Sequence, residues 1–208
     1  MPAARHIVTV AVAAAMLVVP TAAAHAKTAP KKKAPAPKAS IALGDKRPPR
    51  ARASQQCANA NLMPTAEDLD LIRAALLCLH NQVRASKGLP ALRDNPKLRK
   101  AALSHSAEMV DEGYFDHTAP KGDTFVDRIL SAGYTKRNDA WSLGENLAWG
   151  TGDLSTPAGV MNAWMSSPGH KANILKRNYK EVGIGVRLGV PSDAGVGATF
   201  TADFGVKS

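Results

Sequence analysis

Residues 182–206, VGIGVRLGVPSDAGVGATFTADFGV, decide the fold class because their apolar side chains recur at every second position. The alternation runs from Val182 to Leu188, stops at a Pro-Ser-Asp-Ala-Gly turn, and resumes from Val196 to Val206. Strict alternation of apolar and small or polar residues is typical of strands. The segment therefore predicts an antiparallel hairpin near the end of the chain.

The residues before this hairpin show helical periodicity instead. Apolar side chains recur three and four positions apart over 64–88, 95–113, 124–133 and 156–168, and a short fifth helix is expected near His170. Each of the four intervals opens on a Pro, Thr or Asn and ends at a Gly or Pro, which are helix start and stop signals. Because an isolated hairpin is marginal, we expect the helices to cover its apolar face, giving an α+β domain.

The N-terminus has the three regions of a secretory signal. Residues 7–19 are apolar, follow Arg5, and lead to the small-residue site Ala24-His25-Ala26. This run is shorter than the roughly 20 residues that a membrane-spanning helix needs. We predict a signal peptide over residues 1–26, cleaved after Ala26, with an uncleaved anchor as the alternative. Either way the protein is expected to be exported, and so to be secreted or periplasmic.

The basic charge of the chain is concentrated in one segment. Residues 27–56 hold nine Lys or Arg side chains against the single acid Asp45, whereas residues 57–208 are nearly balanced. This segment is also rich in proline and poor in large apolar residues, so we predict a disordered linker. It either contacts an anionic envelope polymer or lipid surface, or serves as a solvated spacer. Nucleic acid is not an expected partner of an exported protein.

Residues 57–208 are enough for one folded domain. They contain both cysteines of the chain, Cys57 and Cys78. In an oxidising compartment an even pair predicts a disulfide, and closing a loop of about 20 residues stabilises the fold by roughly 3 kcal/mol. Two free buried thiols are the alternative.

Chemistry is expected where polar residues interrupt loops of otherwise packed segments. Three segments meet this description: YFDHT at 114–118, GENLAWG at 144–150 and WMSSPGHKANIL at 164–175. Together with LHNQVR at 79–84 and VGIGV at 182–186, they resemble in order and spacing the CAP superfamily of cysteine-rich secretory, antigen 5 and pathogenesis-related 1 proteins. The resemblance is nearest to the bacterial SCP domain and covers about residues 70–206.

The resemblance implies a three-layer α-β-α sandwich with a central cleft. Family members carry two histidines and two glutamates there, which in several cases hold a divalent metal. Matched by motif, the histidines fall on His117 and His170 and one glutamate falls on Glu145. The place of the second glutamate is taken by Ser167. Asn146, next to Glu145, is also expected to line the cleft or to bond loop backbone.

Two imidazoles and a carboxylate suit zinc or another divalent cation and leave a fourth position open. His117, Glu145 and His170 are separated by 28 and 25 residues, so this set depends on the fold bringing them together. The alternative is a hydrogen-bonded polar cluster that braces the cleft without metal. That alternative fits the missing second glutamate.

Three functions follow from the sequence. We favour an exported CAP-domain protein that binds a lipid-like or peptide-like ligand in its cleft, with or without a divalent metal. A metal-dependent hydrolase and an envelope interaction protein that uses its basic tail are the alternatives. Enzymatic activity, the ligand and the oligomeric state stay open. A serine hydrolase is disfavoured because no Gly-x-Ser-x-Gly elbow is present.

Two other histidines are given structural roles. His105 lies on the apolar stripe of the second helix and is expected to be a core histidine whose ring is hydrogen bonded. His80 lies beside the stripe of the first helix and is expected at the surface or in a contact between helices.

Overall fold

The computed structural model describes residues 56–192 and 195–207. The predicted signal peptide and nearly all of the predicted basic linker lie outside these residues. Within the described part, no helix combines the length and the apolar character that crossing a membrane requires.

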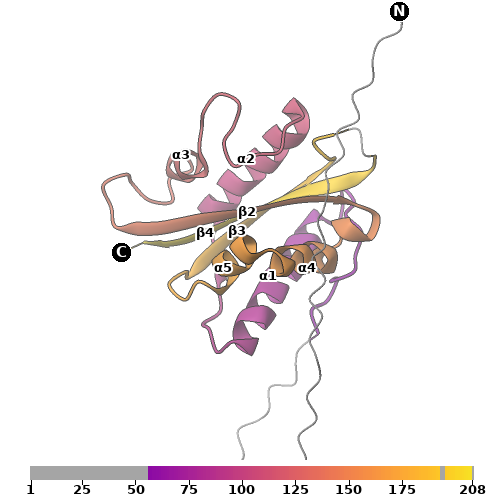
Figure 1. The fold of residues 1–208 in the computed structure, drawn as a ribbon, viewed down its shortest axis with the longest axis horizontal. Coiled ribbons are helices and arrows are strands. Elements are labelled where there is room, and N and C mark those ends of the chain that lie inside the picture. The colour runs from indigo at the N-terminus through magenta and orange to yellow at the C-terminus, as the bar shows by residue number, and fades with distance from the viewer. Residues whose placement is uncertain (1–55, 193–194, 208) are drawn as a thin grey trace, which may run out of the picture. The chain divides into compact units, whose positions relative to one another are not determined.

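A four-stranded mixed sheet forms the middle layer (Figure 1). The strand order is β1 (Arg93–Asp94), β3 (Glu181–Leu188), β4 (Gly197–Lys207) and β2 (Trp141–Thr151). β1 runs parallel to β3, and the other two pairs are antiparallel. The predicted hairpin is therefore confirmed as β3 and β4, and β2 forms one edge of the sheet.

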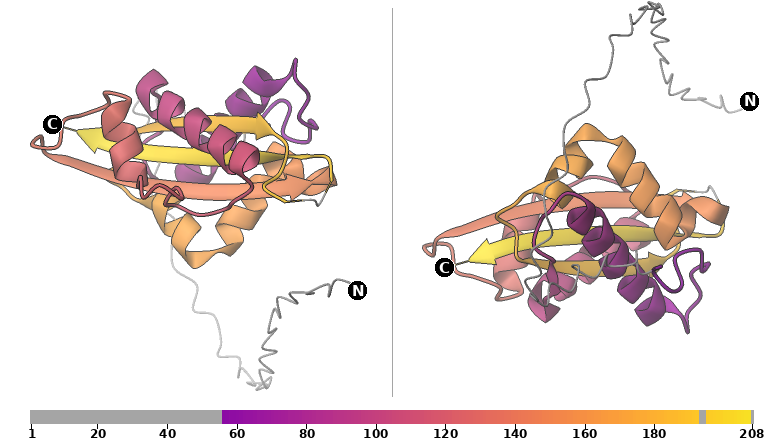
Figure 2. Two further views of the ribbon diagram at one scale, coloured as in Figure 1. Left: turned by 90° about the horizontal axis from the view of Figure 1, so that it is seen from above. Right: turned by 90° about the horizontal axis from the view of Figure 1, so that it is seen from below.

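Helices cover both faces of this sheet, as Figures 1 and 2 show. One face carries α2 (Pro96–Glu112) and α3 (Phe125–Ser131). The other carries α1 (Leu69–Ser86), α4 (Pro157–Ser166) and α5 (Pro168–Leu175), and a short 3-10 turn, η1 (Gly152–Ser155), joins β2 to α4. This is the α-β-α sandwich that the resemblance implied, and it confirms the α+β class.

Local sequence explains where the helices begin and end. At the start of α2 the Asn95 side chain accepts hydrogen bonds from the N–H groups of Lys97 and Leu98, and Gly113 ends the helix in the left-handed conformation. α3 opens with a reciprocal capping box between Thr124 and Asp127. α1 begins later than its Pro-Thr start signal predicted, because the residues before it form turns.

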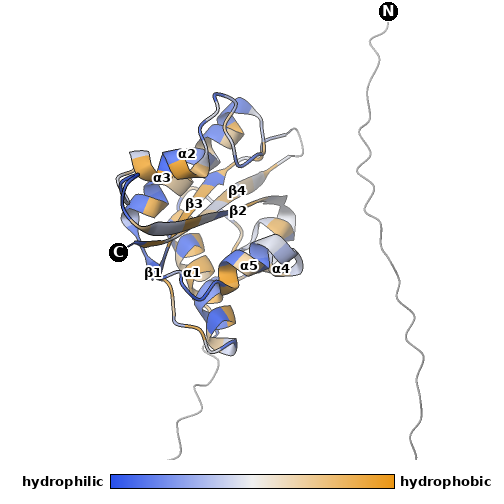
Figure 3. Cartoon of the chain, turned by 60° about the vertical axis from the view of Figure 1, so that its left-hand side comes forward, coloured by the Kyte–Doolittle hydropathy of each residue, from blue (hydrophilic) through white to orange (hydrophobic). Residues whose placement is uncertain are grey.

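The main core lies between the sheet and the layer of α1, α4 and α5. The helices in Figure 3 show both hydrophobic and hydrophilic residues, as expected for elements with one packed side. The largest fully buried side chains in this layer include Ile72, Leu76, Trp164, Phe200 and Phe204. The predicted disulfide between Cys57 and Cys78 is present and ties the residues before α1 to that helix.

The opposite face of the hairpin is also buried, although it is polar. Thr199, Thr201 and Asp203 have no exposed surface because α2 covers them. This close approach depends on Gly183 and Gly185 of β3, where a Cβ atom would overlap the backbone of α2. The glycines of the VGIGV motif therefore let the helix lie directly on the strand.

The structure corrects the prediction of a loop at residues 144–150. These residues lie inside β2, which pairs with β4 from Trp141↔Lys207 to Thr151↔Gly197. The alternation of apolar residues does not reveal this strand because both faces of the sheet are covered here. Buried polar and buried apolar residues therefore follow one another along it. Its burial therefore does not produce the apolar alternation that reveals a half-exposed strand.

Candidate functional site

The candidate site lies along β2, at the edge of the sheet. Three alternate backbone carbonyls of this strand accept hydrogen bonds from side chains of α4, of α5 and of the loop that follows α5. The pairs are Tyr179 Oη with Leu143 O (2.7 Å), Asn173 Nδ2 with Glu145 O (3.1 Å) and Trp164 Nε1 with Leu147 O (2.9 Å). An edge strand otherwise offers free backbone groups to other chains, so these contacts protect it and fix its side chains.

Glu145 is the centre of the site. Its side chain has no exposed surface, and each carboxylate oxygen has a partner. His117 Nδ1 donates to Oε1 at 2.8 Å, and Arg128 Nη2 donates to Oε2 at 2.9 Å. The fold has thus brought together two residues of the predicted set, Glu145 and His117, that lie far apart in the sequence.

Arg128 of α3 is a member of this cluster that the sequence analysis did not single out. Besides Glu145, its guanidinium donates to the backbone carbonyl of His117 at 3.0 Å and to that of Asp123 at 2.9 Å. Its side chain is only 8% exposed. Arg128 therefore both neutralises the buried carboxylate and holds the loop that carries His117. One arginine in a short amphipathic helix gives no sequence signal of this role.

His117 presents its imidazole to solvent from this anchored position. Its side chain is 51% exposed, and its Nε2 has no hydrogen-bond partner among the described residues. The hydrogen bond to Glu145 raises the pKa of His117, and burial opposes this rise only in part. The arrangement favours a cationic, outward-facing imidazole with one nitrogen free for a ligand.

Asp203 lies beside Glu145 on the neighbouring strand, and the sequence patterns did not indicate a role for it. It is the cross-strand partner of Glu145 in β4 and is completely buried. Burial, followed by the charge of Glu145, raises the pKa of Asp203 well above its ordinary range. This environment therefore favours the neutral form of the side chain. The alternation of β4 placed Asp203 opposite the apolar stripe, and nothing in that pattern shows that α2 and α3 cover this face too.

The second histidine lies on the other side of the edge strand. His170 is part of α5, and its backbone carbonyl accepts a hydrogen bond from Asn146 Nδ2 at 3.0 Å. Asn173 donates in turn to Asn146 Oδ1 at 2.9 Å. Asn146 thus bonds backbone, the second of the two roles expected of it. Burial lowers the pKa of the His170 imidazole, and the nearby charge of His117 lowers it further.

Ser167 lies at the junction of α4 and α5. Its backbone carbonyl accepts from Lys171 N at 2.9 Å, and its N–H donates to Trp164 O at 3.2 Å. The structure shows no hydrogen bond from its hydroxyl to His117, Glu145 or His170 within the described part of the chain. Ser167 therefore helps the chain turn between two helices.

The two histidines expected to have structural roles, His105 and His80, form different hydrogen bonds. His105 is buried as predicted, with Nε2 bonded to the carbonyl of Asp116 at 3.0 Å. Of the two places expected for His80, the structure shows the contact between helices and not the surface: His80 of α1 is fully buried between Trp164 of α4 and Phe204. Its Nδ1 bonds the Leu76 carbonyl at 2.8 Å, and burial lowers its pKa to about 4.

The positions of His117, Glu145 and His170 decide whether the expected metal site can form. Among the described residues, no three His, Cys, Asp or Glu side chains are grouped so that they could hold an ion. Glu145 already uses both oxygens, and His117 uses one nitrogen to bind it. What the site offers to solvent is a pair of imidazoles on either side of β2.

Comparison with known proteins identifies bacterial relatives of this chain. Two proteins of Bacillus subtilis (strain 168) match: uncharacterized protein YkwD, 37% identical over 107 residues, and uncharacterized membrane protein YlbC, 33% identical over 111 residues. These matches cover 51% and 53% of this chain but only 39% and 30% of the relatives, so the chain spans well under half of their length.

Solved structures show the same fold. An extracellular protein containing an SCP domain from Bacillus anthracis str. Ames is 26% identical with a TM-score of 0.52, covering 68% of this chain and 43% of that one. An outer surface protein from Borrelia burgdorferi is 23% identical with a TM-score of 0.53, covering 70% and 97%. The family model of the cysteine-rich secretory protein family matches residues 77–204, which is more than half of the chain. Fold, motifs and match agree: this chain belongs to the cysteine-rich secretory protein (CAP) family.

Proposed function

We propose that this chain is an exported CAP-domain binding protein whose ligand contacts His117 and His170 at the edge of β2. The ligand class is peptide-like or lipid-like, with a polar or anionic group that meets the His117 imidazole. Export is supported by the signal expected over residues 1–26 and by the extracellular relative from Bacillus anthracis.

One observation carries this proposal: a half-exposed imidazole is held by a carboxylate that is itself fully buried. Burying Glu145 costs free energy unless the carboxylate is paired and hydrogen bonded, and both partners are present. A histidine that only stabilised the fold would have no need to keep its other nitrogen in solvent. The cluster therefore orients His117 for a contact outside the protein.

The residues do not fit a closed zinc site. Catalytic zinc usually has three protein ligands, whereas only two imidazoles are free here. Glu145 has the position of the carboxylate that orients a histidine rather than that of a ligand. Cation binding by this chain is thus proposed only as a weak site on two imidazoles. This arrangement also weakens the metal-dependent hydrolase, because Glu145 is neither exposed nor free to act as a base.

The proposal predicts that ligand binding depends on His117. The full chain is titrated with a short acidic peptide and, separately, with palmitate, while the imidazole signals of His117 and His170 are followed by NMR. One probe should shift both signals, and His117→Ala should weaken that binding about tenfold, the equivalent of one charge-assisted hydrogen bond. Lys121→Ala, at an exposed position in the same loop region, is the control and should change nothing. If neither probe shifts either histidine, the proposal fails.

Zinc in the same experiment tests the metal alternative. We expect weak binding to the wild type and about tenfold tighter binding to Ser167→Glu, which supplies the carboxylate that the family has at this position. Tight zinc binding by the wild type, unaffected by Ser167→Glu, would show instead that the three predicted residues form a metal site by themselves.

A further inference from the structure

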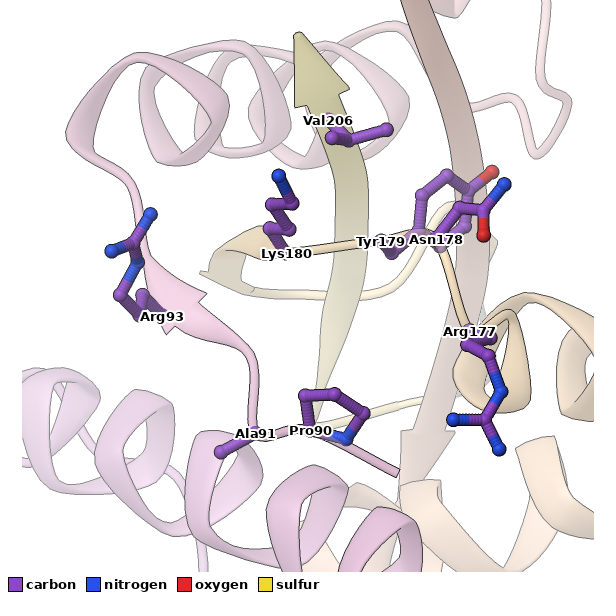
Figure 4. Close-up of a pocket in the computed structure, with 8 residues that line it drawn as sticks. All are labelled: Pro90, Ala91, Arg93, Arg177, Asn178, Tyr179, Lys180 and Val206. Carbon is purple, nitrogen blue, oxygen red and sulfur yellow. The ribbon is translucent and has the colours of Figure 1, made fainter. Parts of the chain in front are cut away.

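A hollow lies at the end of the sheet where β1 and β3 begin, and no histidine lines it (Figure 4). Its volume is about 740 Å³, within the range of small-ligand sites. The loop after α1 and the loop between α5 and β3 form most of its wall. The lining includes Pro90, Ala91, Arg93, Arg177, Lys180 and Val206.

All the charged residues that line this hollow are basic. Arg93, Arg177 and Lys180 line the hollow, and no acidic residue does. Figure 4 shows Arg93 and Arg177 on opposite sides, with Lys180 between them. Within the part of the chain that the structure describes, none of the three forms an ion pair within 4.0 Å. Two acids adjoin these cations in sequence: Asp94 pairs with Arg99, and Glu181 is bonded to Tyr134 and Asn95 and also interacts electrostatically with Arg93.

A buried guanidinium fixes the shape of this wall. Arg84 of α1 has no exposed surface and donates only to backbone carbonyls. Its partners are Pro90 O (2.8 Å), Ile174 O (2.8 Å), Lys176 O (3.0 Å) and Tyr179 O (3.2 Å). One side chain thus holds both loops together. Arg84 also adds a positive charge near the hollow. Two of the residues whose carbonyls it binds, Pro90 and Tyr179, line the hollow.

We infer that this hollow is a binding site for a phosphate ester with a small apolar body. Guanidinium groups match the geometry of phosphate oxygens, and Arg177 and Lys180, for which the structure shows no ion pair within the described residues, supply cations for such an anion, with Arg93 on the opposite side. Pro90, Ala91 and Val206 supply apolar surface beside the cations. The phosphate belongs either to a soluble ester or to a lipid headgroup. This site is separate from the histidine site and does not depend on its ligand.

The test uses the full chain and glycerol 3-phosphate, followed by backbone amide NMR. Amides of residues 91–93 and 177–180 should shift together and saturate. Residue-level signals separate this site from binding to the basic segment at 27–56. In the double variant Arg177→Gln, Lys180→Gln, both exposed positions, Kd should rise about tenfold or more, as expected for losing charge-assisted hydrogen bonds. Lys100→Gln, exposed on α2, is the matched control and should leave Kd unchanged.

Vesicles identify the source of the phosphate. If phosphatidylglycerol vesicles displace glycerol 3-phosphate and phosphatidylcholine vesicles do not, the ligand is a headgroup; if neither displaces it, the ligand is a soluble ester. The inference is overturned if the amides of the two loops do not shift with either probe. It is equally overturned if the double variant binds as tightly as the wild type, which would indicate diffuse attraction to basic residues.

Discussion

Replacing Arg84 with alanine is expected to lower the free energy of unfolding by about 4 kcal/mol, because four backbone carbonyls lose their donor at once. Each unsatisfied buried group costs roughly 1–3 kcal/mol, although water entering the space would recover part of this. Domains of this size are stable by roughly 5–15 kcal/mol, so the variant should be close to unfolding at 37 °C. Urea unfolding followed by circular dichroism measures the change.

Two variants control this experiment. Arg84→Lys keeps the charge but cannot reach four carbonyls from one ammonium group, so its stability should be intermediate. Arg187→Ala removes an exposed arginine that pairs with Asp111, and it should cost about 1 kcal/mol or less. A loss for Arg84→Ala no larger than that for Arg187→Ala would contradict the bracing role of Arg84.

The second large effect is expected at Arg128. Arg128→Ala leaves Glu145 buried without its guanidinium partner, so that only His117 still bonds the carboxylate, and Asp203 lies beside it on β4. Breaking a buried ion pair by removing one partner costs about 3–5 kcal/mol. The loss should be measured by the same unfolding experiment, with Arg137→Ala as the control, since Arg137 is 70% exposed and pairs with Asp127 at the surface.

A double variant shows whether the cost comes from the unpaired carboxylate. Adding Glu145→Gln to Arg128→Ala removes the uncompensated charge, so it should restore about half of the lost stability. If the double variant is as unstable as the sum of both single variants, Arg128 and Glu145 are not coupled, and the cluster described here is wrong.

The sequence revealed those parts of the fold whose signals are local. The caps of α2 at Asn95 and Gly113 follow from short-range chemistry, and the β3–β4 hairpin follows from alternation over many residues. β2 was hidden because its burial on both faces mixes polar and apolar residues. The sequence left two places open for His80 for a related reason: a position beside a helical stripe does not show that Trp164 will pack over it.

The site shows the same difference between residues with a local sequence signal and residues whose role depends on tertiary contacts. His117, Glu145 and His170 were found through motifs, and the pairing of Glu145 with His117 is what the fold adds. Arg128 and Asp203 carry no motif that the sequence analysis used. Their roles arise only when α3 and β4 are brought against β2, since pairings over such sequence distances depend on tertiary packing.

The central claim is that the buried Glu145 carboxylate holds an outward-facing His117 imidazole. The most direct measurement is an NMR pH titration of His117 and His170 in the wild type and in Glu145→Gln. We expect His117 in the wild type to titrate above the ordinary value of 6.5, and the substitution to lower its pKa; His170 should titrate below that value in both. Because the folded-state pKa of His117 is raised, its contribution to stability should be present below pH 6.5 and lost as the pH rises through the raised value. A His117 that titrates at or below 6.5 in the wild type, with no response to Glu145→Gln, would contradict this claim.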